Sequence, residues 1–246
     1  MFQEKISRIS LYIALFVLAL MWFVFFLDFT FELELYHFGI FPLHTKGLIG
    51  IIAAPFIHST HDIAHIFNNS LPTLVLIWLL FYHYRTIATR VFLIIYLLTG
   101  IATWLLARES YHIGMSGVIY GLTSFLVFSG FFRKNMRVAA VSLFVIFIYG
   151  SLVWGIFPMQ ENISWEGHAL GLFAGIIVAV LYKYQGPQPQ KMRYELEEEL
   201  GIESENEYWK EGEIIPPHSG PFGEKLVEQG LTITYTYKPN EEESKK

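Results

Sequence analysis

Cysteine is missing from all 246 residues of the sequence. Its absence excludes disulfide bonds, thiolate metal sites and cysteine nucleophiles. Charge is also scarce, because only 16% of the residues are Asp, Glu, Lys or Arg, whereas 53% are hydrophobic and the mean hydropathy is +0.41. A chain with this composition is too apolar to be an ordinary soluble domain.

Acidic charge is concentrated in the C-terminal tail. Residues 187–246 hold 14 acidic and 7 basic side chains, whereas the other 186 residues hold 8 acidic and 10 basic ones. The formal net charge of −5 therefore belongs to the tail and does not indicate a nucleic-acid partner. The linker QGPQPQ separates this tail from the rest, which predicts a core over 1–184 and a tail over 185–246.

The tail contains two short patterns. MRYELEEELG is typical of a short helix that ends at Gly201, and LTITYTYK alternates apolar residues and threonines as a half-buried strand does. Because about sixty residues make a marginal core at best, a small module and a disordered tail are both open.

Long charge-poor runs dominate the core. A helix needs about 20 mostly apolar residues to cross the hydrocarbon of a membrane. Candidate runs occupy 9–27, 61–82, 91–107, 113–132, 138–159 and 167–182, of which 61–82 is the most polar. These runs predict an all-α membrane protein, a bundle of six transmembrane helices.

Two apolar segments need separate treatment. The run 9–27 is longer than the apolar region of a signal peptide, and no small-x-small cleavage site follows it, so we expect a retained membrane span. GLIGIIAAPFI at 47–57 is too short to cross, which favours an interfacial or re-entrant piece in the long loop 28–60.

Basic residues at the ends of the runs predict the orientation, because cytoplasmic loops of membrane proteins are enriched in Lys and Arg. With the N-terminus inside, the outer side has only Lys46 and Arg108. The inner side then has Lys5, Arg8, Arg85, Arg90, Arg133, Lys134, Arg137 and Lys183. We therefore expect a multi-pass protein with both termini cytoplasmic, in a bacterial inner membrane.

Four polar residues inside the runs are candidate functional residues. His65, Asn69, Ser116 and His168 occur near the starts of the second, fourth and sixth runs, all of which begin on the outer side. Polar groups within membrane spans are costly and usually face a cavity or one another. The topology thus predicts that these four side chains lie in one layer, a few residues below the outer surface.

This set fits an acyl-transfer site. A serine hydroxyl needs a base to take its proton, and His168 can serve Ser116 in that way. His65 and Asn69 are four apart, share a helix face, and can donate hydrogen bonds to a developing oxyanion. Taken alone, Ser116 is more often a small residue that lets helices pack, and His65 is open to a structural, relay or metal role.

Other patterns near these residues favour structural roles or none. Gly171 and Gly175 form a small-xxx-small pair typical of helix packing. Glu166 lies close to His168 in sequence, but its place at the outer interface favours a solvated side chain. Val118 occupies the position where the nucleophile elbow of α/β-hydrolases requires glycine.

Three histidines, His58, His61 and His65, invite a zinc interpretation, but no H-E-x-x-H pattern accompanies them. We therefore predict no metal site and no cofactor.

The motifs together resemble those of the rhomboid intramembrane serine proteases. GMSG at 114–117, GHALGLFAG at 167–175 and HIFNN at 65–69 are similar to signatures of that family, and the resemblance covers about 9–184. The first loop lacks the Trp-Arg pair that many rhomboids have, and His58 and His61 both compete for the family's earlier histidine.

The resemblance implies roles for individual residues. Ser116 is expected to be the nucleophile and His168 the general base, with no acidic third member. His65 and Asn69 are expected to help form the oxyanion hole, and Tyr120 to pack against the catalytic histidine. Glycines expected to allow close helix approach are Gly114, Gly117 and Gly171.

The function implied is cleavage of membrane-anchored proteins in or near a transmembrane helix. The expected partners are such substrates and the lipid bilayer, without nucleic acid, and the oligomeric state stays open. An alternative is a catalytically silent rhomboid-like adaptor that binds transmembrane clients. A transporter is disfavoured, because the spans contain no mid-depth carboxylate for coupling.

Overall fold

The computed structural model describes residues 2–133, 140, 143, 147, 155–157 and 164–186. The chain divides into two compact units, Met1–Pro189 and Gln190–Lys246, and only the first contains described residues. The short helix and the strand predicted in the tail therefore lie outside the described residues, as does the predicted tail 185–246 apart from its first two residues.

The described part of the chain is helical and contains no β-strand. It has three 3-10 helices: η1 (Leu35–Phe38), η2 (Thr45–Leu48) and η3 (Ala54–Phe56). Its α-helices are α1 (Phe2–Phe31), α2 (Gly50–Ala53), α3 (Ile63–His83), α4 (Ala88–Leu106), α5 (Ser116–Phe132) and α8 (Trp165–Leu181). The prediction of an all-α protein is thus confirmed for these residues.

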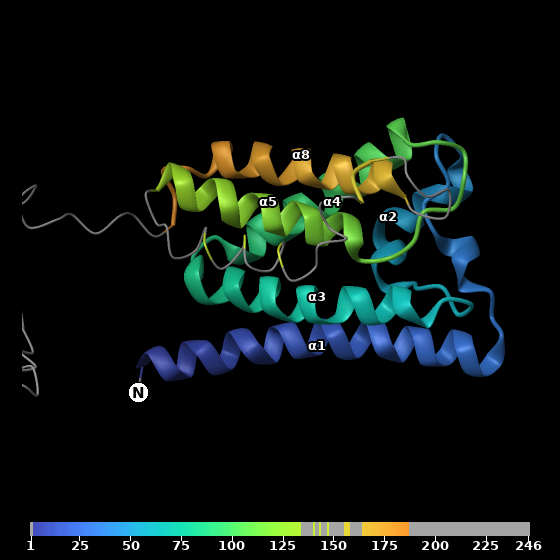
Figure 1. Ribbon diagram of the computed structural model, residues 1–246, viewed down its shortest axis with the longest axis horizontal. Helices are drawn as coiled ribbons and strands as arrows, with labels where there is room; N and C mark the ends of the chain where they lie inside the picture. Colours follow the sequence, from blue (N-terminus) through green and yellow to red (C-terminus); the bar gives the residue numbers. More distant parts are fainter. Residues whose placement is uncertain are drawn as a thin grey trace, which may run out of the picture. The chain divides into compact units, whose positions relative to one another are not determined.

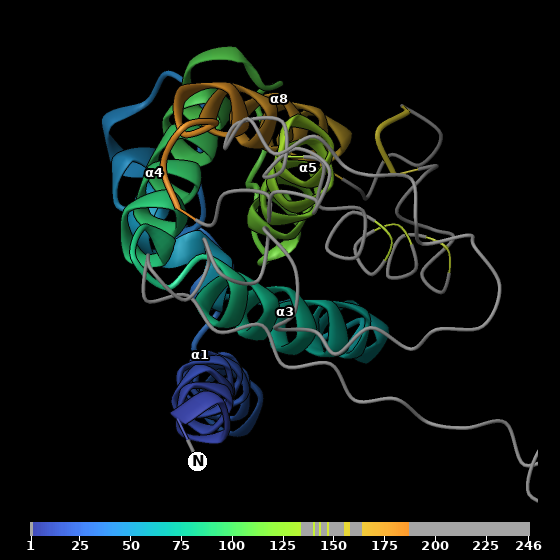
Figure 2. The ribbon, with the colours of Figure 1, turned by 90° about the vertical axis from the view of Figure 1, so that its left-hand side faces the viewer.

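The five long helices lie side by side along one direction (Figure 1). Helices α3, α5 and α8 begin at the end where α1 and α4 finish, and the short α2 lies at that same end. In the view along the helices, α4, α5 and α8 are grouped together, and α1 lies at the edge beside α3 (Figure 2). Three chain segments that are distant in sequence therefore start close together.

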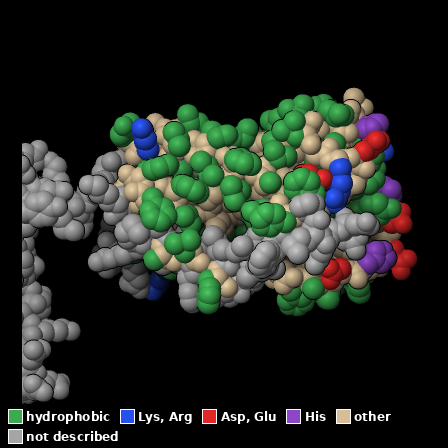
Figure 3. All heavy atoms as spheres, turned by 45° about the horizontal axis from the view of Figure 1, so that its top comes forward, with side chains coloured by type: hydrophobic (Ala, Val, Ile, Leu, Met, Phe, Trp, Pro, Cys, Tyr) green, Lys and Arg blue, Asp and Glu red, His purple; other side chains and the backbone are tan. Residues whose placement is uncertain are grey.

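Among the described residues, three helices are long and apolar enough to cross a membrane: Ile6–Phe31 within α1, α3 and α4. Helices α5 and α8 are apolar but shorter, at 17 residues each. Hydrophobic side chains cover much of the visible surface, whereas Asp, Glu and His side chains gather at its right-hand end (Figure 3). Long apolar helices together with a large exposed apolar surface indicate an integral membrane protein.

The predicted spans match helices except in their bounds and in one case that is not described. Helix α1 extends beyond both ends of 9–27, and α5 begins three residues later than 113 because Gly114 has a φ of 101°, a left-handed conformation that interrupts a helix. The run 138–159 falls largely outside the described residues. The count of six spans therefore stays a prediction.

Helices α5 and α8 form the most extensive contact between described helices, and glycine makes it possible. A Cβ atom at Gly171 would overlap the carbonyl oxygen of Gly117, and one at Gly175 would overlap that of Gly121. Lipid provides no hydrophobic drive for helices to associate, so close backbone packing of this kind stabilises the pair. We call this contact the glycine seam. It packs Gly171 of α8 directly on Gly117, the residue after Ser116.

The loop between α1 and α3 folds into short helices rather than a span. Gly47 and Gly50 have no room for a side chain, because a Cβ there would overlap the backbone of Phe41 and of Gly39 and Ile40. Ile52, in contrast, is 62% exposed on the other side of this segment. The segment thus has one face on the protein and one apolar face that is open, at the end of the bundle that holds the candidate site.

Candidate active site

Ser116 is the first residue of α5 and follows a tight turn. Gly114 in that turn donates its backbone N–H to the carbonyl of Ala54 at 2.8 Å. A Cβ atom at Gly114 would lie 2.5 Å from Nε2 of His65, so the turn rests directly on that imidazole. The positive φ and this close approach both require glycine, and together they fix where Ser116 enters the helix.

His168 faces Ser116 across the glycine seam. Its Nε2 lies 2.8 Å from Oγ of Ser116, and its Nδ1 lies 2.8 Å from the carbonyl oxygen of Gly155. A carbonyl oxygen can only accept, so Nδ1 carries the proton and Nε2 presents its lone pair to the serine hydroxyl. His168 is buried, at 8% exposure, whereas Ser116 is partly exposed.

Tyr120 covers one face of the His168 ring. The two rings are stacked with centroids 4.3 Å apart and an interplanar angle of 12°. Tyr120 comes one helical turn after Ser116, so α5 supplies both the hydroxyl and the aromatic ring that restrains the imidazole. The imidazole is thereby held by a ring contact on its face and by hydrogen bonds at both nitrogens.

His65 and Asn69 lie in the first two turns of α3. Asn69 is buried and donates from Nδ2 to the carbonyl of His65 at 2.8 Å, while Nδ1 of His65 accepts from the backbone of Ser59 at 3.5 Å. Within the described residues, no hydrogen bond links either side chain to Ser116 or His168. The structure thus brings His65 against the turn before Ser116, and among the described residues one N–H of the Asn69 amide has no acceptor.

His58, and not His61, is the second histidine beside His65. The rings of His58 and His65 have centroids 5.0 Å apart, whereas His61 is exposed. His58 is 1% exposed and donates from Nδ1 to the carbonyl of Phe56 at 3.3 Å. Burial, together with the neighbouring His65, lowers the pKa of His58 to about 3. His58 is therefore neutral at physiological pH.

The expectation of a solvated Glu166 is wrong. Glu166 is 8% exposed, and Oε1 lies 3.6 Å from Nε of Arg108. The loop before α5 folds back over the start of α8 and brings Arg108 to it, a contact that sequence separation hides. Glu166 is also not a third member beside His168, since the Nδ1 of that histidine bonds to Gly155.

A cavity of about 40 Å³ adjoins Ser116, and the sequence reasoning did not identify the threonines that line it. Its polar lining includes the side chains of Thr99, Thr103, His112 and Ser164. Within the described residues, the Thr99 hydroxyl has no hydrogen-bond partner. The volume is sufficient for water, which needs about 10–15 Å³ per molecule. The sequence signal that could have identified the threonines is the spacing of Thr99 and Thr103, which lie four residues apart in an apolar stretch of α4.

No cluster of three or more His, Asp or Glu side chains suited to a metal ion occurs in the described part of the chain. His58 and His65 are adjacent, but carboxylates do not complete a ligand set around them there. The observed chemistry is therefore that of a serine–histidine pair with a small polar cavity.

Comparison with known proteins gives one family. The family model described as the Rhomboid domain matches residues 45–185. The chain is 35% identical over 152 residues to uncharacterized proteins of Mycobacterium bovis and Mycobacterium tuberculosis, covering 58% of this chain and 62% of each relative. An uncharacterized protein of Mycobacterium leprae is 33% identical over 153 residues, with 58% of this chain and 59% of the relative covered. The chain thus spans about three fifths of the length of these curated relatives.

Proposed function

The chain belongs to the rhomboid family, and from that premise we propose that it is an intramembrane serine endopeptidase with Ser116 and His168 as its catalytic dyad. The substrates are membrane-anchored proteins, cleaved in or near a transmembrane helix. The protein acts with six spans and both termini in the cytoplasm of a bacterium, because the basic residues between the apolar runs favour that orientation. No cofactor takes part in the proposed reaction.

The observation that carries the proposal is the 2.8 Å contact between Nε2 of His168 and Oγ of Ser116, in the tautomer that accepts a proton. As Ser116 Oγ attacks the peptide carbonyl, its proton moves to Nε2 of His168. The imidazolium then donates that proton to the leaving amine nitrogen, the C–N bond breaks, and an acyl-enzyme remains.

Hydrolysis reverses the proton path with water as the nucleophile. His168 takes a proton from water, the resulting hydroxide adds to the ester carbonyl, and Ser116 Oγ leaves with the proton that His168 returns. The cavity lined by Thr99 and Thr103 adjoins Ser116 and offers hydroxyl groups to hold that water. This supply matters because the hydrocarbon around the bundle contains none.

The oxyanion of both tetrahedral intermediates needs hydrogen-bond donors. The first backbone N–H groups of α5, including that of Ser116, have no intrahelical acceptor, and the helix dipole adds positive potential there. We assign His65 and Asn69 as the further donors, since His65 abuts Gly114 and Asn69 has a second amide N–H to give. Loss of one such donor costs about 100- to 1,000-fold in turnover in comparable sites.

A fluorophosphonate probe and a transmembrane reporter substrate test the proposal on the full chain in detergent or liposomes. Wild type should be labelled covalently and should cleave the reporter, whereas Ser116→Ala and His168→Ala should do neither while keeping the melting temperature of wild type. Phe173→Leu, on the exposed side of α8, is the matched control and should behave as wild type. Full reporter cleavage by Ser116→Ala refutes the dyad. Reporter capture without labelling or cleavage by wild type refutes proteolysis in favour of an adaptor that binds clients.

A further inference from the structure

The loop 107–115 leads into Ser116, which comes four residues after His112, and His112 is bonded at both ring nitrogens. Nδ1 lies 2.6 Å from Oγ of Ser164, and Nε2 lies 2.9 Å from the carbonyl oxygen of Arg108. Because that carbonyl can only accept, Nε2 carries the proton and the Ser164 hydroxyl donates to Nδ1. His112 is 4% exposed, and burial lowers its pKa, although the hydrogen bond to the Arg108 carbonyl and the charge of Glu166 act to raise the pKa. The neutral ring is thus the form that this arrangement holds.

Ser164 is the N-cap of the helix that carries His168. Its side chain accepts from the backbone N–H of Gly167 at 3.3 Å, and its carbonyl accepts from the N–H of His168 at 3.2 Å. A serine at this position satisfies N–H groups that the first helical turn leaves free. The bond to His112 therefore connects the first turn of α8, which contains His168, to the loop that leads into Ser116.

We propose that His112 is a positioning residue for the dyad: through Ser164 it fixes the start of α8 against the loop before Ser116, and so sets the distance between Ser116 and His168. This role rests on the proposed proteolytic function. The loop end of this link is itself anchored, because His112 pairs with Ile40 through backbone hydrogen bonds in both directions. The ion pair of Arg108 with Glu166 joins the same two segments and supports the same register.

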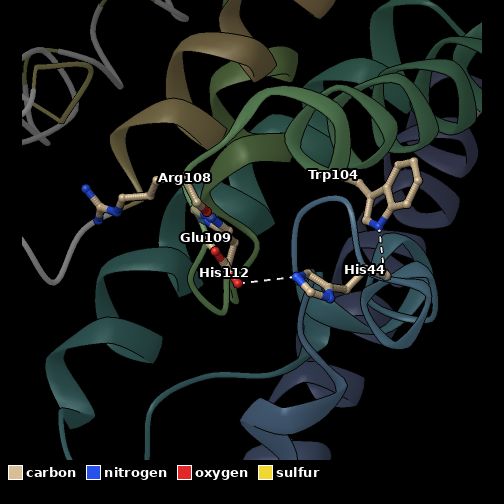
Figure 4. Close-up of polar contacts among 5 residues, drawn as sticks. All are labelled: His44, Trp104, Arg108, Glu109 and His112. Atoms are coloured by element: carbon tan, nitrogen blue, oxygen red, sulfur yellow. Dashed lines mark hydrogen bonds and ion pairs between the residues drawn. The ribbon is translucent and has the colours of Figure 1, made fainter.

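Two polar contacts to His44, one from this loop and one from the end of α4, serve as an internal comparison. Glu109 meets His44 at 3.2 Å, and Trp104 donates to the His44 carbonyl at 3.0 Å, both on the exposed side toward the first loop (Figure 4). Neither contact reaches α8. An exposed side-chain contact of this type contributes little to stability, and neither contact touches His168.

Two substitutions of His112 separate its two hydrogen bonds. His112→Asn keeps an acceptor where Nδ1 was and so keeps the Ser164 bond, whereas His112→Gln keeps a donor where Nε2 was and keeps only the Arg108 bond. We expect His112→Gln to lower kcat about 10- to 100-fold with KM within about twofold, because small displacements of reacting groups cost rate. We expect His112→Asn to retain most of kcat. Glu109→Gln, in the same loop, should equal wild type.

Substitution of the partner tests whether the two residues act as one link. Ser164→Gly removes the hydroxyl but is tolerated as an N-cap, so its loss of kcat should match that of His112→Gln. The double variant should lose no more than either single variant, and Ser164→Thr should retain more activity than Ser164→Gly. Additive losses, or equal kcat in His112→Gln and Glu109→Gln, overturn the proposal.

Amide hydrogen exchange gives a readout that needs no activity. His112→Gln and Ser164→Gly should speed exchange at Gly167 and His168 about 10-fold, and Glu109→Gln should not, because local opening governs exchange. Faster exchange with unchanged kcat overturns the positioning role. If wild type neither cleaves the reporter nor is labelled, the proposed function fails. Unchanged amide exchange in His112→Gln would separately reject the link between His112 and Ser164.

Discussion

At the α5–α8 contact the two backbones touch through glycine, whereas at the α1–α3 contact aromatic side chains fill the gap. Gly171 has no room for a methyl group beside Gly117. Trp22 of α1, in contrast, meets Phe67 of α3 edge to face with centroids 5.0 Å apart and donates to Ser70 at 3.0 Å. A side-chain contact can adjust by a change of rotamer, whereas a backbone contact can adjust only if a whole helix moves. The proposed dyad lies on the contact that adjusts least.

This difference gives a physical reason for the placement of the site. Proton transfer needs Ser116 and His168 within hydrogen-bond reach, and a displacement of about 1 Å can cost 100-fold in rate. If a substrate helix enters the bundle, a helix contact other than the one between α5 and α8 has to open. The α1–α3 side depends on soft aromatic packing and one side-chain hydrogen bond, so substitutions there should affect activity less than those in the glycine seam.

The largest expected effect is that of Gly171→Ala in the seam. The added methyl group would overlap the Gly117 carbonyl and must push α8 away from α5. We expect a loss of kcat/KM of about 100-fold or more, because His168 moves with α8. Reporter cleavage and the melting temperature check it, with Phe173→Leu on the exposed face of α8 as control. If Gly171→Ala has the activity and stability of wild type, α5 and α8 can move apart without harm and the prediction is wrong.

The second-largest effect is expected at Arg133, which joins the C-terminal ends of α5 and α8. Arg133 is 2% exposed and donates to Ser129 and to the carbonyls of Tyr182 and Gln185. Arg133→Met leaves these acceptors without a donor, so we expect a destabilisation of about 3 kcal/mol, with the residual activity per folded molecule nearly unchanged.

Thermal unfolding in detergent measures the effect of Arg133, and Arg133→Lys is the informative companion. Lysine keeps the charge but not the planar fork, so it should recover only part of the stability. Full recovery by lysine would mean that charge, not the geometry of the hydrogen bonds, matters at this end of the seam.

The glycine seam and the proximity of Ser116 to His168 were largely predictable from sequence, the seam from short-range spacing and the proximity from the count of apolar runs. The four-residue spacing of Gly171 and Gly175 indicated close packing, and the start of the apolar runs placed Ser116 and His168 at one end. The bounds of α5 were missed by three residues, since the positive φ of Gly114 follows from its contact with His65 and not from local composition.

Features that depend on the loops were not predictable. Glu166 pairs with Arg108 only because the loop before α5 folds over α8, and the same fold brings His112 to Ser164. The choice between His58 and His61 likewise needed the path of the chain into α3, which buries one and exposes the other. Hydropathy fixes which segments enter a membrane, but it carries no information on contacts between their connecting loops.

A smaller effect is expected from pH at His58, beside the start of α3. Its folded pKa of about 3 is below the unfolded value of about 6.5, so the unfolded chain binds the proton more readily. Stability is therefore full above pH 6.5 and declines as the pH falls from there toward 3. At pH 5 one such group costs about 2 kcal/mol.

Melting curves between pH 7.5 and 5 measure that decline. His58→Asn keeps an N–H donor for the Phe56 carbonyl but does not titrate, so its stability should fall less steeply with acid. His61→Asn is the matched control, because His61 is exposed. Parallel slopes for wild type and His58→Asn would rule out His58 as the acid-sensitive group.

The smallest effect is expected at the α1–α3 contact, from Trp22→Phe. This change removes the hydrogen bond to Ser70 while an aromatic ring remains against Phe67. Hydrogen bonds between membrane helices average about 0.6 kcal/mol, so the melting temperature should fall by only about 1–2 °C. Ser70→Ala removes the same bond from the other side, and the double variant should be no less stable than either single one. Reporter cleavage should stay within about twofold of wild type, because the Ser116–His168 distance does not depend on this contact. A loss of activity as large as that of Gly171→Ala would mean that the α1–α3 side also holds the dyad, and that the two contacts do not differ in the way their packing implies.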